Sequence, residues 1–410
     1  MVHSPQRVAV VGAGMVGLST AWFLQEHGVG VTVLDRTGVA AGSSWGNAGW
    51  LTPGLATPLP EPAVLRYGVR AVLSPSSPVY VPLTADRRLL QFMVRFTRNS
   101  TMRRWREAMA ALVPINSIAL EAFDLLGAGG VEAPTHEAHS FIAAYRSEAD
   151  RATLLEEIEH IRASGQTLEH EVLTGDEARA VEPALSDEIT AAIRLYGQRF
   201  VTPSHYLRDL AASVERRGGR IVSGVEVGAL HDTGTAVRVA GETYDAAVIA
   251  SGAWLNALAR PFGVRVPVQA GRGYSFTVGV QRTPRGPIYF PTQRVACTPV
   301  GDRLRVAGMM EFRPADAALD TRRIAAIVEA ARPLLRGADL DTRRDEWVGA
   351  RPCTPDGLPL VGATRSDRVF VAGGHGMWGI TLGPATGRLL ADLVVTGRSS
   401  RTLRPFDPLR

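Results

Sequence analysis

The first turn of the chain constrains its fold more than any other feature. An apolar run, Val8–Val11, is too short for a helix and ends directly on Gly12. Gly12, Gly14 and Gly17 fill the three glycine positions of a G-x-G-x-x-G turn, and the proline-free segment Met15–Leu24 suits a helix. This order of strand, tight turn and helix is typical of a dinucleotide-binding βαβ unit.

Each glycine of such a turn has its own physical role. Gly12 allows a sharp bend, Gly14 lets the backbone approach a pyrophosphate, and Gly17 lets the helix pack closely on the strand. A second apolar run, Val29–Leu34, ends on Asp35, where the motif needs an acid for the ribose hydroxyls. The alternative is a glycine-rich turn in an ordinary α/β domain.

Composition excludes several kinds of site. The 410-residue chain has a formal net charge of +5, and all 45 of its basic residues are arginine. The sequence therefore has no P-loop lysine, Schiff-base lysine or lysine general base. Its charge predicts no nucleic-acid partner. Its two cysteines, Cys297 and Cys353, form neither a metal-binding spacing nor a disulfide framework, so we expect no metal and a reducing, cytoplasmic compartment.

Membrane contact is left open by the sequence. We expect no signal peptide, because the first strand begins close to Met1, and no run of about eighteen uncharged apolar residues that would span a membrane. The predicted helix Thr84–Asn99 mixes apolar and arginine side chains. Such a helix either touches the inner face of a membrane or a partner, or packs on its own domain. The oligomeric state is not predicted.

The remaining pattern predicts an α/β fold. We expect helices at Met102–Leu126, Ser147–Ser164, Pro203–Arg217, Asp320–Leu334 and Pro384–Leu393. We expect strands at Ser140–Tyr145, Arg220–Val222, Ala236–Val239, Ala246–Ala250, Leu358–Val361 and Val369–Ala372. Val266–Met310 favours a mostly antiparallel sheet, and Pro53–Pro82 favours irregular structure. A Rossmann-like nucleotide domain of discontinuous segments, with a second domain woven through it, fits this order.

A second glycine-rich turn follows the strand Val369–Ala372. The segment Gly373–Gly379 leads into a helix that we expect to begin near Thr381 or Pro384. The N-terminus of that helix would stabilise negative charge on a ligand, as a reduced flavin ring requires.

Arg351 precedes this turn and stands between an apolar strand and a proline, which gives its cation a rigid mount. It is either a clamp for a ligand carboxylate or the partner of one of the chain's 40 acidic residues.

These motifs together resemble the D-amino-acid oxidase family of flavoproteins, in the family's order and over nearly the whole chain. The segments that carry the resemblance are Gly12–Gly17, Arg36, Ser43–Gly49, Gly271–Tyr274, Gly349–Gly357 with Arg351, and Gly374–Gly376. Asn47–Gly54 looks most like bacterial D-amino-acid dehydrogenases, and Gly383–Gly387 is similar to glycine oxidases.

The resemblance implies FAD as the cofactor, with Asp35 on the adenosine ribose and the Val225 backbone on the adenine. It implies non-covalent binding, because relatives that tether FAD through a cysteine do so at a place equivalent to about Gly349, not at Cys353. The residues assigned to FAD are Gly12, Ala13, Gly14, Met15, Gly17, Asp35, Arg36, Ser43, Ser44, Asn47, Ala48, Gly49, Val225, Gly252, Gly374, His375, Gly376, Met377, Gly379, Ile380 and Thr381.

The resemblance also implies a domain division and catalytic residues. Residues 1–60, 200–264 and 337–410 would form the FAD-binding domain, and residues 61–199 and 265–336 the substrate domain. Arg351 would bind the substrate carboxylate. Tyr274 and Tyr289 are the candidates for the active-site tyrosine of glycine oxidases, although each is equally an ordinary strand tyrosine.

The implied reaction is oxidative deamination of a D-amino acid or glycine-like substrate by hydride transfer from its α-carbon to flavin N5. The resulting imine would hydrolyse to an oxo acid and an amine, and O2 or a respiratory-chain acceptor would take the electrons. The first alternative is an O2-dependent oxidase of secondary amino acids that releases peroxide. An NAD-dependent dehydrogenase and a non-catalytic flavin-binding protein are the other two.

Overall fold

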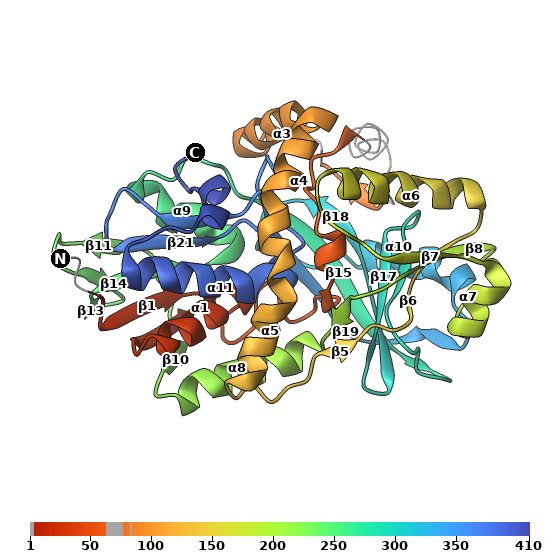
Figure 1. Ribbon diagram of the computed structural model, residues 1–410, viewed down its shortest axis with the longest axis horizontal. Coiled ribbons are helices and arrows are strands. Elements are labelled where there is room, and N and C mark those ends of the chain that lie inside the picture. Colours follow the sequence, from red (N-terminus) through yellow and green to blue (C-terminus); the bar gives the residue numbers. More distant parts are fainter. Residues whose placement is uncertain (1–3, 63–76, 83) are drawn as a thin grey trace.

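The computed structural model describes residues 4–62, 77–82 and 84–410. Two sheets with their helices stand side by side, a six-stranded sheet in the left half of Figure 1 and a nine-stranded sheet in the right half. Segments from both ends and the middle of the chain build the first sheet, so the two-part α/β fold that the sequence predicts is confirmed.

The six-stranded sheet is parallel except at one edge, where β20 runs antiparallel to β21. Its strands in spatial order are β10 (Arg220–Ser223), β2 (Gly30–Asp35), β1 (Arg7–Val11), β14 (Ala246–Ile249), β21 (Val369–Gly373) and β20 (Leu360–Ala363). The helices α1 (Met15–Glu26), α8 (Pro203–Arg216) and α11 (Gly379–Thr396) cover one face.

Both faces of this sheet are buried, as the continuous apolar run of β1 requires. Val8 and Val10 face the helices and belong to the core that α1 and α11 share. Ala9 and Val11 face a second core with the short helix α9 (Leu255–Ala259) and the small sheet of β11 (Leu230–Asp232), β12 (Val237–Val239) and β13 (Glu242–Tyr244).

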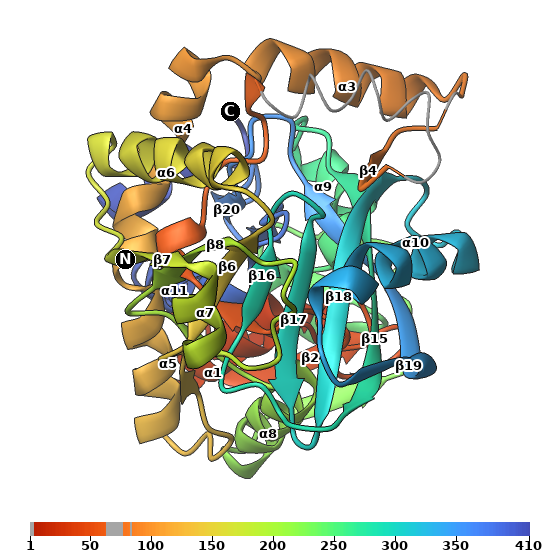
Figure 2. The ribbon, with the colours of Figure 1, turned by 90° about the vertical axis from the view of Figure 1, so that its right-hand side faces the viewer.

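The nine-stranded sheet is mostly antiparallel; among its described strands, the pairs β16–β6 and β18–β4 are parallel. The order is β19 (Ala338–Cys353), β15 (Gln269–Val280), β18 (Arg303–Phe312), β17 (Val295–Val300), β16 (Ile288–Phe290), β6 (Phe141–Tyr145), β8 (Ala191–Leu195) and β7 (His170–Thr174), with β4 (Val79–Tyr80) beside β18. Figure 2 shows α10 (Thr321–Ala331) lying across β15 and β18, and α6 (Glu148–Ala163) and α7 (Gly175–Val181) at the other end.

At β19, the sheet that the strand joins differs from the domain to which the sequence assigns its residues. Residues 337–410 are assigned by the sequence to the FAD-binding domain, yet β19 pairs with β15 in the nine-stranded sheet. The domain division as a whole stays a prediction. The strands β3 (Trp50–Leu51), β9 (Arg199–Phe200) and β5 (His136–Glu137) form a separate three-stranded sheet, and Trp50 packs against Phe141 of the nine-stranded sheet.

The apolar stretch Met102–Ala128 is two helices rather than the one expected. α4 (Met102–Ser117) is interrupted at Ile118, and α5 (Ala119–Ala128) continues it as the next stretch of the same column in Figure 1. By length and composition alone this stretch is long and apolar enough to cross a membrane. Leu112, Ile115 and Phe123 instead pack into the core that α1 and α11 share, which accounts for its apolar character.

Helix α3 (Arg87–Asn99) precedes α4 at the top of Figure 1. Its start is capped by Asp86, whose carboxylate accepts a hydrogen bond from the Arg88 N–H. The segment Pro53–Pro82 contains a single 3-10 turn (Pro53–Leu55) and β4 within its described part, and residues 63–76 lie outside it.

Candidate cofactor cleft and active site

The first glycine turn has the packing that its motif predicts. A Cβ on Gly12, whose φ is +117°, would lie 2.4 Å from the Ala250 carbonyl oxygen, and a Cβ on Gly17 would lie 1.9 Å from the Gly12 carbonyl oxygen. Both glycines are therefore needed to seat α1 on β1 and β14. At Gly14, by contrast, the nearest atom to a Cβ is Ser44 Oγ at 3.4 Å. No backbone atom of the described residues comes within 4 Å of this Cβ position, so the glycine leaves room for a ligand to approach the turn.

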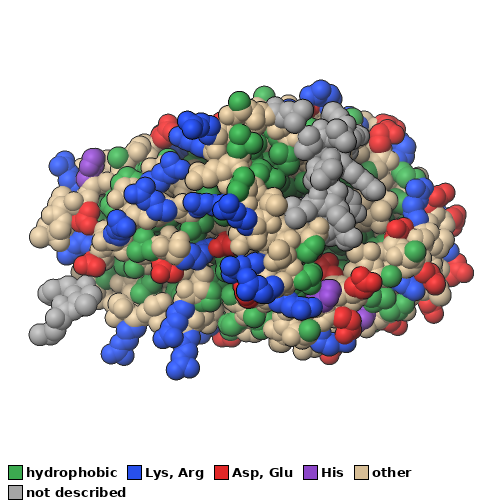
Figure 3. Space-filling model, turned by 90° about the horizontal axis from the view of Figure 1, so that it is seen from above, with side chains coloured by type: hydrophobic (Ala, Val, Ile, Leu, Met, Phe, Trp, Pro, Cys, Tyr) green, Lys and Arg blue, Asp and Glu red, His purple; other side chains and the backbone are tan. Residues whose placement is uncertain are grey.

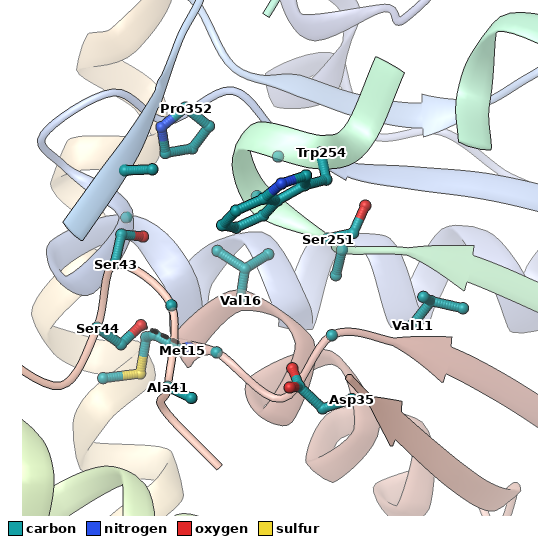
Figure 4. A pocket seen from close by; sticks show the side chains of 18 of the residues that line it. Val11, Met15, Val16, Asp35, Ala41, Ser43, Ser44, Ser251, Trp254 and Pro352 are labelled. Atoms are coloured by element: carbon teal, nitrogen blue, oxygen red, sulfur yellow. Dashed lines mark hydrogen bonds between the residues drawn. The ribbon is translucent and has the colours of Figure 1, made fainter. Parts of the chain in front are cut away.

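A cavity of about 380 Å³ lies above this turn, where β1, β2, β14 and β21 end. Figure 4 shows Met15, Asp35, Ser43, Ser44 and Ser251 from separate segments around it. Of the residues that the sequence assigns to FAD, those that line this cavity are Gly12, Gly14, Met15, Asp35, Arg36, Ser43, Ser44, Asn47, Val225, Gly252, His375, Gly376, Met377, Gly379 and Ile380.

The other assigned residues do not line this cavity. Ala48 and Thr381 line a second cavity next to it. Ala13 is part of the turn itself, and its N–H donates to Asp35 Oδ2 at 2.9 Å. Gly17 is a packing position, and a Cβ on Gly49 would strike the Val201 carbonyl oxygen. The remaining residue, Gly374, packs against Thr354 and Leu360.

Asp35 lies at the end of β2 with its carboxylate at the cavity (Figure 4). Its Oδ1 accepts hydrogen bonds from the Thr37 and Gly38 N–H groups, each at 2.9 Å. The Val225 N–H donates to the Asp35 carbonyl oxygen at 3.0 Å, which places the segment after β10 against the same end of the cavity.

Arg36 is held by two residues that the sequence analysis missed. Its guanidinium lies 3.7 Å from the ring centroid of Trp254, and its Nη2 lies 3.0 Å from Asp316 Oδ1. The Trp254 indole N–H also donates to Asp316, at 3.0 Å. Trp254 follows directly after the Ser251–Ala253 turn. Its place next to a turn at a strand end was the sequence signal that could have marked it as a cavity residue.

Two buried polar atoms at this cavity have no hydrogen-bond partner within the described residues: Ser251 Oγ and His375 Nδ1. The other ring nitrogen of His375 is 2.9 Å from the Thr386 hydroxyl, and burial lowers the pKa of His375 to about 4. The neutral imidazole of His375 and the hydroxyl of Ser251 can therefore each form a hydrogen bond with a polar atom of a bound ligand. With the open side of Gly14, they fit a large dinucleotide such as FAD.

A second cavity, of about 220 Å³, adjoins the first, and Asn47, Arg351 and Met377 line both. Arg351 Nη1 donates to the Met309 carbonyl oxygen at 2.8 Å. A Cβ on Gly273 would lie 2.1 Å from Arg351 Nη2, so the guanidinium rests on bare backbone.

Burial lowers the pKa of Arg351, and no carboxylate of residues 4–62, 77–82 or 84–410 lies within 4.0 Å of its guanidinium. No described acidic residue therefore supports the interpretation of Arg351 as one half of a structural ion pair. A buried cation at the junction of two cavities is arranged to receive an anion from outside the protein.

A backbone connection joins Arg351 to the second glycine turn. Cys353 and His375 form an isolated antiparallel bridge, and the Gly376 N–H donates to the Pro352 carbonyl oxygen at 2.8 Å. The end of β19 and the turn after β21 are thus one hydrogen-bonded unit.

The two candidate tyrosines, Tyr274 and Tyr289, differ in their position relative to the cavities. Tyr289 lines the second cavity. Tyr274 lines neither cavity, and its hydroxyl donates to buried Glu311 at 2.6 Å. Alternation along β15 explains the difference, because Gly271 and Gly273 face Cys353 and Arg351 while Tyr274 points to the opposite side. The structure therefore brings Tyr289 but not Tyr274 to the cavity that Arg351 lines, and a catalytic role for either tyrosine stays a prediction.

Comparison with known proteins agrees with this geometry. A protein-family profile described as "FAD dependent oxidoreductase" matches residues 7–393. The chain belongs to this family. The family is defined by FAD, so the alternative of an NAD-dependent dehydrogenase is wrong.

Curated relatives of this FAD-dependent oxidoreductase are named D-amino acid dehydrogenase. The protein from Xanthobacter autotrophicus is 30% identical over 406 residues, covering 95% of each chain. The protein from Methylobacterium sp. is 32% identical over 415 residues, covering 96% of each.

The fold of this oxidoreductase is that of glycine oxidase from Geobacillus kaustophilus, with a TM-score of 0.73, 23% identity and coverage of 100% and 99% of the two chains. L-proline dehydrogenase from P. horikoshii has the same fold, with a TM-score of 0.70, 16% identity and coverage of 100% and 98%.

Proposed function

We propose that this protein oxidises D-amino acids to imines with FAD, and that Arg351 binds the substrate carboxylate. The observation that carries the proposal is the buried Arg351 guanidinium, which has no described acidic partner at the junction of the two cavities. The names of the relatives, each about 30% identical over almost the full chain, support the substrate class.

The chain's residues supply binding and orientation. FAD, when bound, accepts the hydride of the substrate α-carbon. Arg351 would hold the carboxylate through a charge-assisted hydrogen bond, and its pairing with the Met309 carbonyl would keep the guanidinium in one orientation. Trp50, Met309 and Trp378 line the second cavity and would keep water from the substrate. Tyr289 would face the same substrate.

We infer that FAD is held without a covalent bond to cysteine. Both cysteines are buried and unpaired, and neither lines the 380 Å³ cavity. Burial also raises the pKa of the Cys353 thiol to about 12, which removes the thiolate that an attack on the flavin ring would need. Precipitation with acid should therefore release all yellow colour into the supernatant, whereas colour in the pellet contradicts this inference.

The proposed location is the cytoplasm, with α3 touching the inner face of the membrane, where a respiratory acceptor would take the electrons. On α3, Leu90 and Val94 are 52% and 51% exposed, between exposed Arg88 and Arg95. Seen from above, this side of the molecule carries many arginine side chains and patches of hydrophobic ones (Figure 3). Basic residues beside exposed apolar ones suit an anionic membrane surface.

Anaerobic flavin bleaching tests the reaction. Added D-amino acids should bleach the flavin of the purified protein, and L-enantiomers and N-alkyl glycines should do so more slowly. Arg351→Leu should raise KM by orders of magnitude while the protein stays yellow. Unchanged kinetics in this variant would remove Arg351 as the carboxylate anchor, and bleaching by N-alkyl glycines alone, with peroxide release in air, would favour the secondary-amine oxidase.

A further inference from the structure

Asp316 is a charged residue outside the cofactor cavity whose carboxylate contacts two residues that line it. One carboxylate oxygen, Oδ1, lies 3.0 Å from Arg36 Nη2, and the other, Oδ2, accepts a hydrogen bond from the Trp254 indole N–H at 3.0 Å. The Arg36 guanidinium in turn lies 3.7 Å from the centroid of the Trp254 ring. These three side chains form a closed set, the Asp316 cluster, in which each contacts the other two.

The members of the Asp316 cluster come from both large sheets. Arg36 directly follows β2, and Trp254 ends the 3-10 turn after β14, so both extend the six-stranded sheet. Asp316 lies between α10 and β18, a strand of the nine-stranded sheet. Arg36 and Trp254 line the cofactor cavity, and Figure 4 shows the Trp254 ring among its side chains, whereas Asp316 does not line it. The wall of the cofactor cavity is thus held from the side of the other sheet.

The backbone next to Asp316 is fixed from inside the protein. Arg272 on β15, whose side chain is fully buried, donates through Nη2 to the carbonyl oxygens of Ala317 and Ala318, at 2.7 Å and 2.8 Å. The Ala317 N–H donates to the Pro314 carbonyl oxygen at 3.1 Å, which closes a turn around Asp316. Because hydrogen bonds to a charged donor are strong, this segment presents the Asp316 carboxylate in a defined place.

The electrostatics of the Asp316 cluster favour an effect on geometry rather than on stability. Burial raises the pKa of the Asp316 carboxyl, but the hydrogen bond from Trp254 and the hydrogen bond and charge of Arg36 outweigh it and hold this pKa below its usual value. The Asp316 side chain is 65% exposed and that of Arg36 is 38% exposed, so this ion pair alone contributes little to the stability of the fold. What the carboxylate does is restrict a long, flexible arginine to one position over the indole ring.

We propose that Asp316 is a positioning residue for the cofactor: it holds Arg36 over Trp254 and so keeps this wall of the cavity in the arrangement that retains FAD. Asp316 acts through Arg36 and does not itself contact the cofactor. The proposal goes beyond the proposed function, because it concerns the retention of FAD and no amino-acid substrate takes part in it. It rests on FAD being bound without a covalent bond.

The direction of the effect separates positioning from simple charge balance. FAD carries a negatively charged pyrophosphate. If Asp316 only neutralised Arg36, its loss would leave a free cation beside an anionic cofactor and would slow the release of FAD. If Asp316 positions Arg36, its loss lets the guanidinium leave the Trp254 ring, and the release of FAD becomes faster.

Release of FAD from the loaded enzyme after dilution, followed by the fluorescence of the free flavin, tests the proposal. Asp316→Asn keeps the shape of the side chain and can still accept the Trp254 hydrogen bond, but it loses the charge that holds Arg36. It should release FAD at least fivefold faster than the wild type, and Asp316→Glu, which keeps the carboxylate, should restore most of this difference. Asp341→Asn is the matched control, because Asp341 forms an exposed ion pair with Arg332 and lines neither cavity. It should release FAD at the wild-type rate.

A second background shows whether Asp316 acts through Arg36. In Arg36→Leu, the further change Asp316→Asn should speed release less than twofold, since the contact is already lost. The proposal is overturned by release from Asp316→Asn at or below the wild-type rate, by equal acceleration in Asp341→Asn, by additive effects of Asp316→Asn and Arg36→Leu, or by no release from any variant. None of these results bears on the proposed function, because bleaching of the FAD-loaded enzyme by D-amino acids is a separate measurement.

Discussion

The guanidinium of Arg351 lies directly on the backbone of β15 at Gly273, so the position of this proposed substrate anchor should be sensitive to a single added methyl group. The clash that a Cβ would cause involves the end of a flexible side chain, not backbone. A substitution at Gly273 should therefore move the guanidinium and leave the fold intact.

We accordingly expect Gly273→Ala to raise KM for D-amino acids at least tenfold while FAD stays bound and Tm falls by only a few degrees. Gly279→Ala is the matched control, since Gly279 lies on the same strand and no atom comes within 4 Å of its Cβ position. Steady-state kinetics of the two variants make the comparison. A normal KM in Gly273→Ala would mean that Arg351 does not anchor the substrate where we find it.

The sequence could predict residues whose signal is local. The glycine turns, Asp35 at a strand end and Arg351 before a proline are each recognised from their neighbours in the chain. The position of Tyr274 had no such signal, because choosing between the two sides of β15 requires knowing that Gly271 and Gly273, not Tyr274, lie on the side of Cys353 and Arg351. Glu157, which lines the second cavity, had no such signal. It lies on a helix rich in glutamate, and only tertiary packing turns this one toward the cavity.

At the scale of elements, the first turn separates two requirements for glycine. Gly17→Ala should destabilise the fold by several kcal/mol, because its Cβ would strike the backbone oxygen of Gly12. Gly14→Ala should leave the free energy of unfolding of the FAD-free protein within about 1 kcal/mol of wild type, yet weaken FAD binding at least tenfold. Urea denaturation and flavin fluorescence titration measure the two quantities. Tight FAD binding by Gly14→Ala would contradict the role given to this turn.

Helix α3 makes a prediction about vesicle binding. The protein should sediment with vesicles that contain phosphatidylglycerol, and added salt should weaken this binding. Val94→Glu should reduce the bound fraction more than Gln91→Glu, which adds the same charge at an exposed polar position of α3. Equal losses in the two variants would show that the apolar side chain does not insert.

The location of helices and strands was more predictable than their limits. α6 and α8 match their predicted ranges within two residues, since a serine cap and a threonine–proline start mark their beginnings. The break at Ile118 between α4 and α5 has no glycine or proline at the residue itself; the proline of this stretch, Pro114, lies four residues earlier, inside α4. Likewise, α11 begins at Gly379, ahead of the expected start near Thr381 or Pro384.

At the scale of the whole molecule, the buried neutral His375 links stability to pH. Its pKa is about 4 in the folded protein and about 6.5 when unfolded, so the unfolded chain binds the proton more tightly. The stabilisation is complete above pH 6.5 and is lost as the pH falls from 6.5 toward 4. Its full size is about 3 kcal/mol.

Chemical denaturation of the purified protein at pH 7.5 and pH 4.5 tests this linkage. The wild type should lose about 2–3 kcal/mol more between these pH values than His375→Gln does. His205→Gln, at an exposed histidine, is the control and should behave as the wild type. Parallel losses in all three proteins would rule out His375 as the source.

The backbone bridge between Cys353 and His375 has a consequence for how such enzymes diversify. Because the proposed carboxylate anchor and the turn proposed to face the flavin share one hydrogen-bonded unit, we expect the reacting carbon to keep its place whatever side chain the substrate carries. Glu61, Glu157 and Arg294 line the second cavity but not the cofactor cavity. New substrate specificities can therefore evolve by exchange of residues around these three, while the residues around the cofactor stay the same. To change substrate specificity by design, residues at that end of the cavity are the ones to substitute, and Cys353 and His375, whose backbones form the bridge, are the ones to keep.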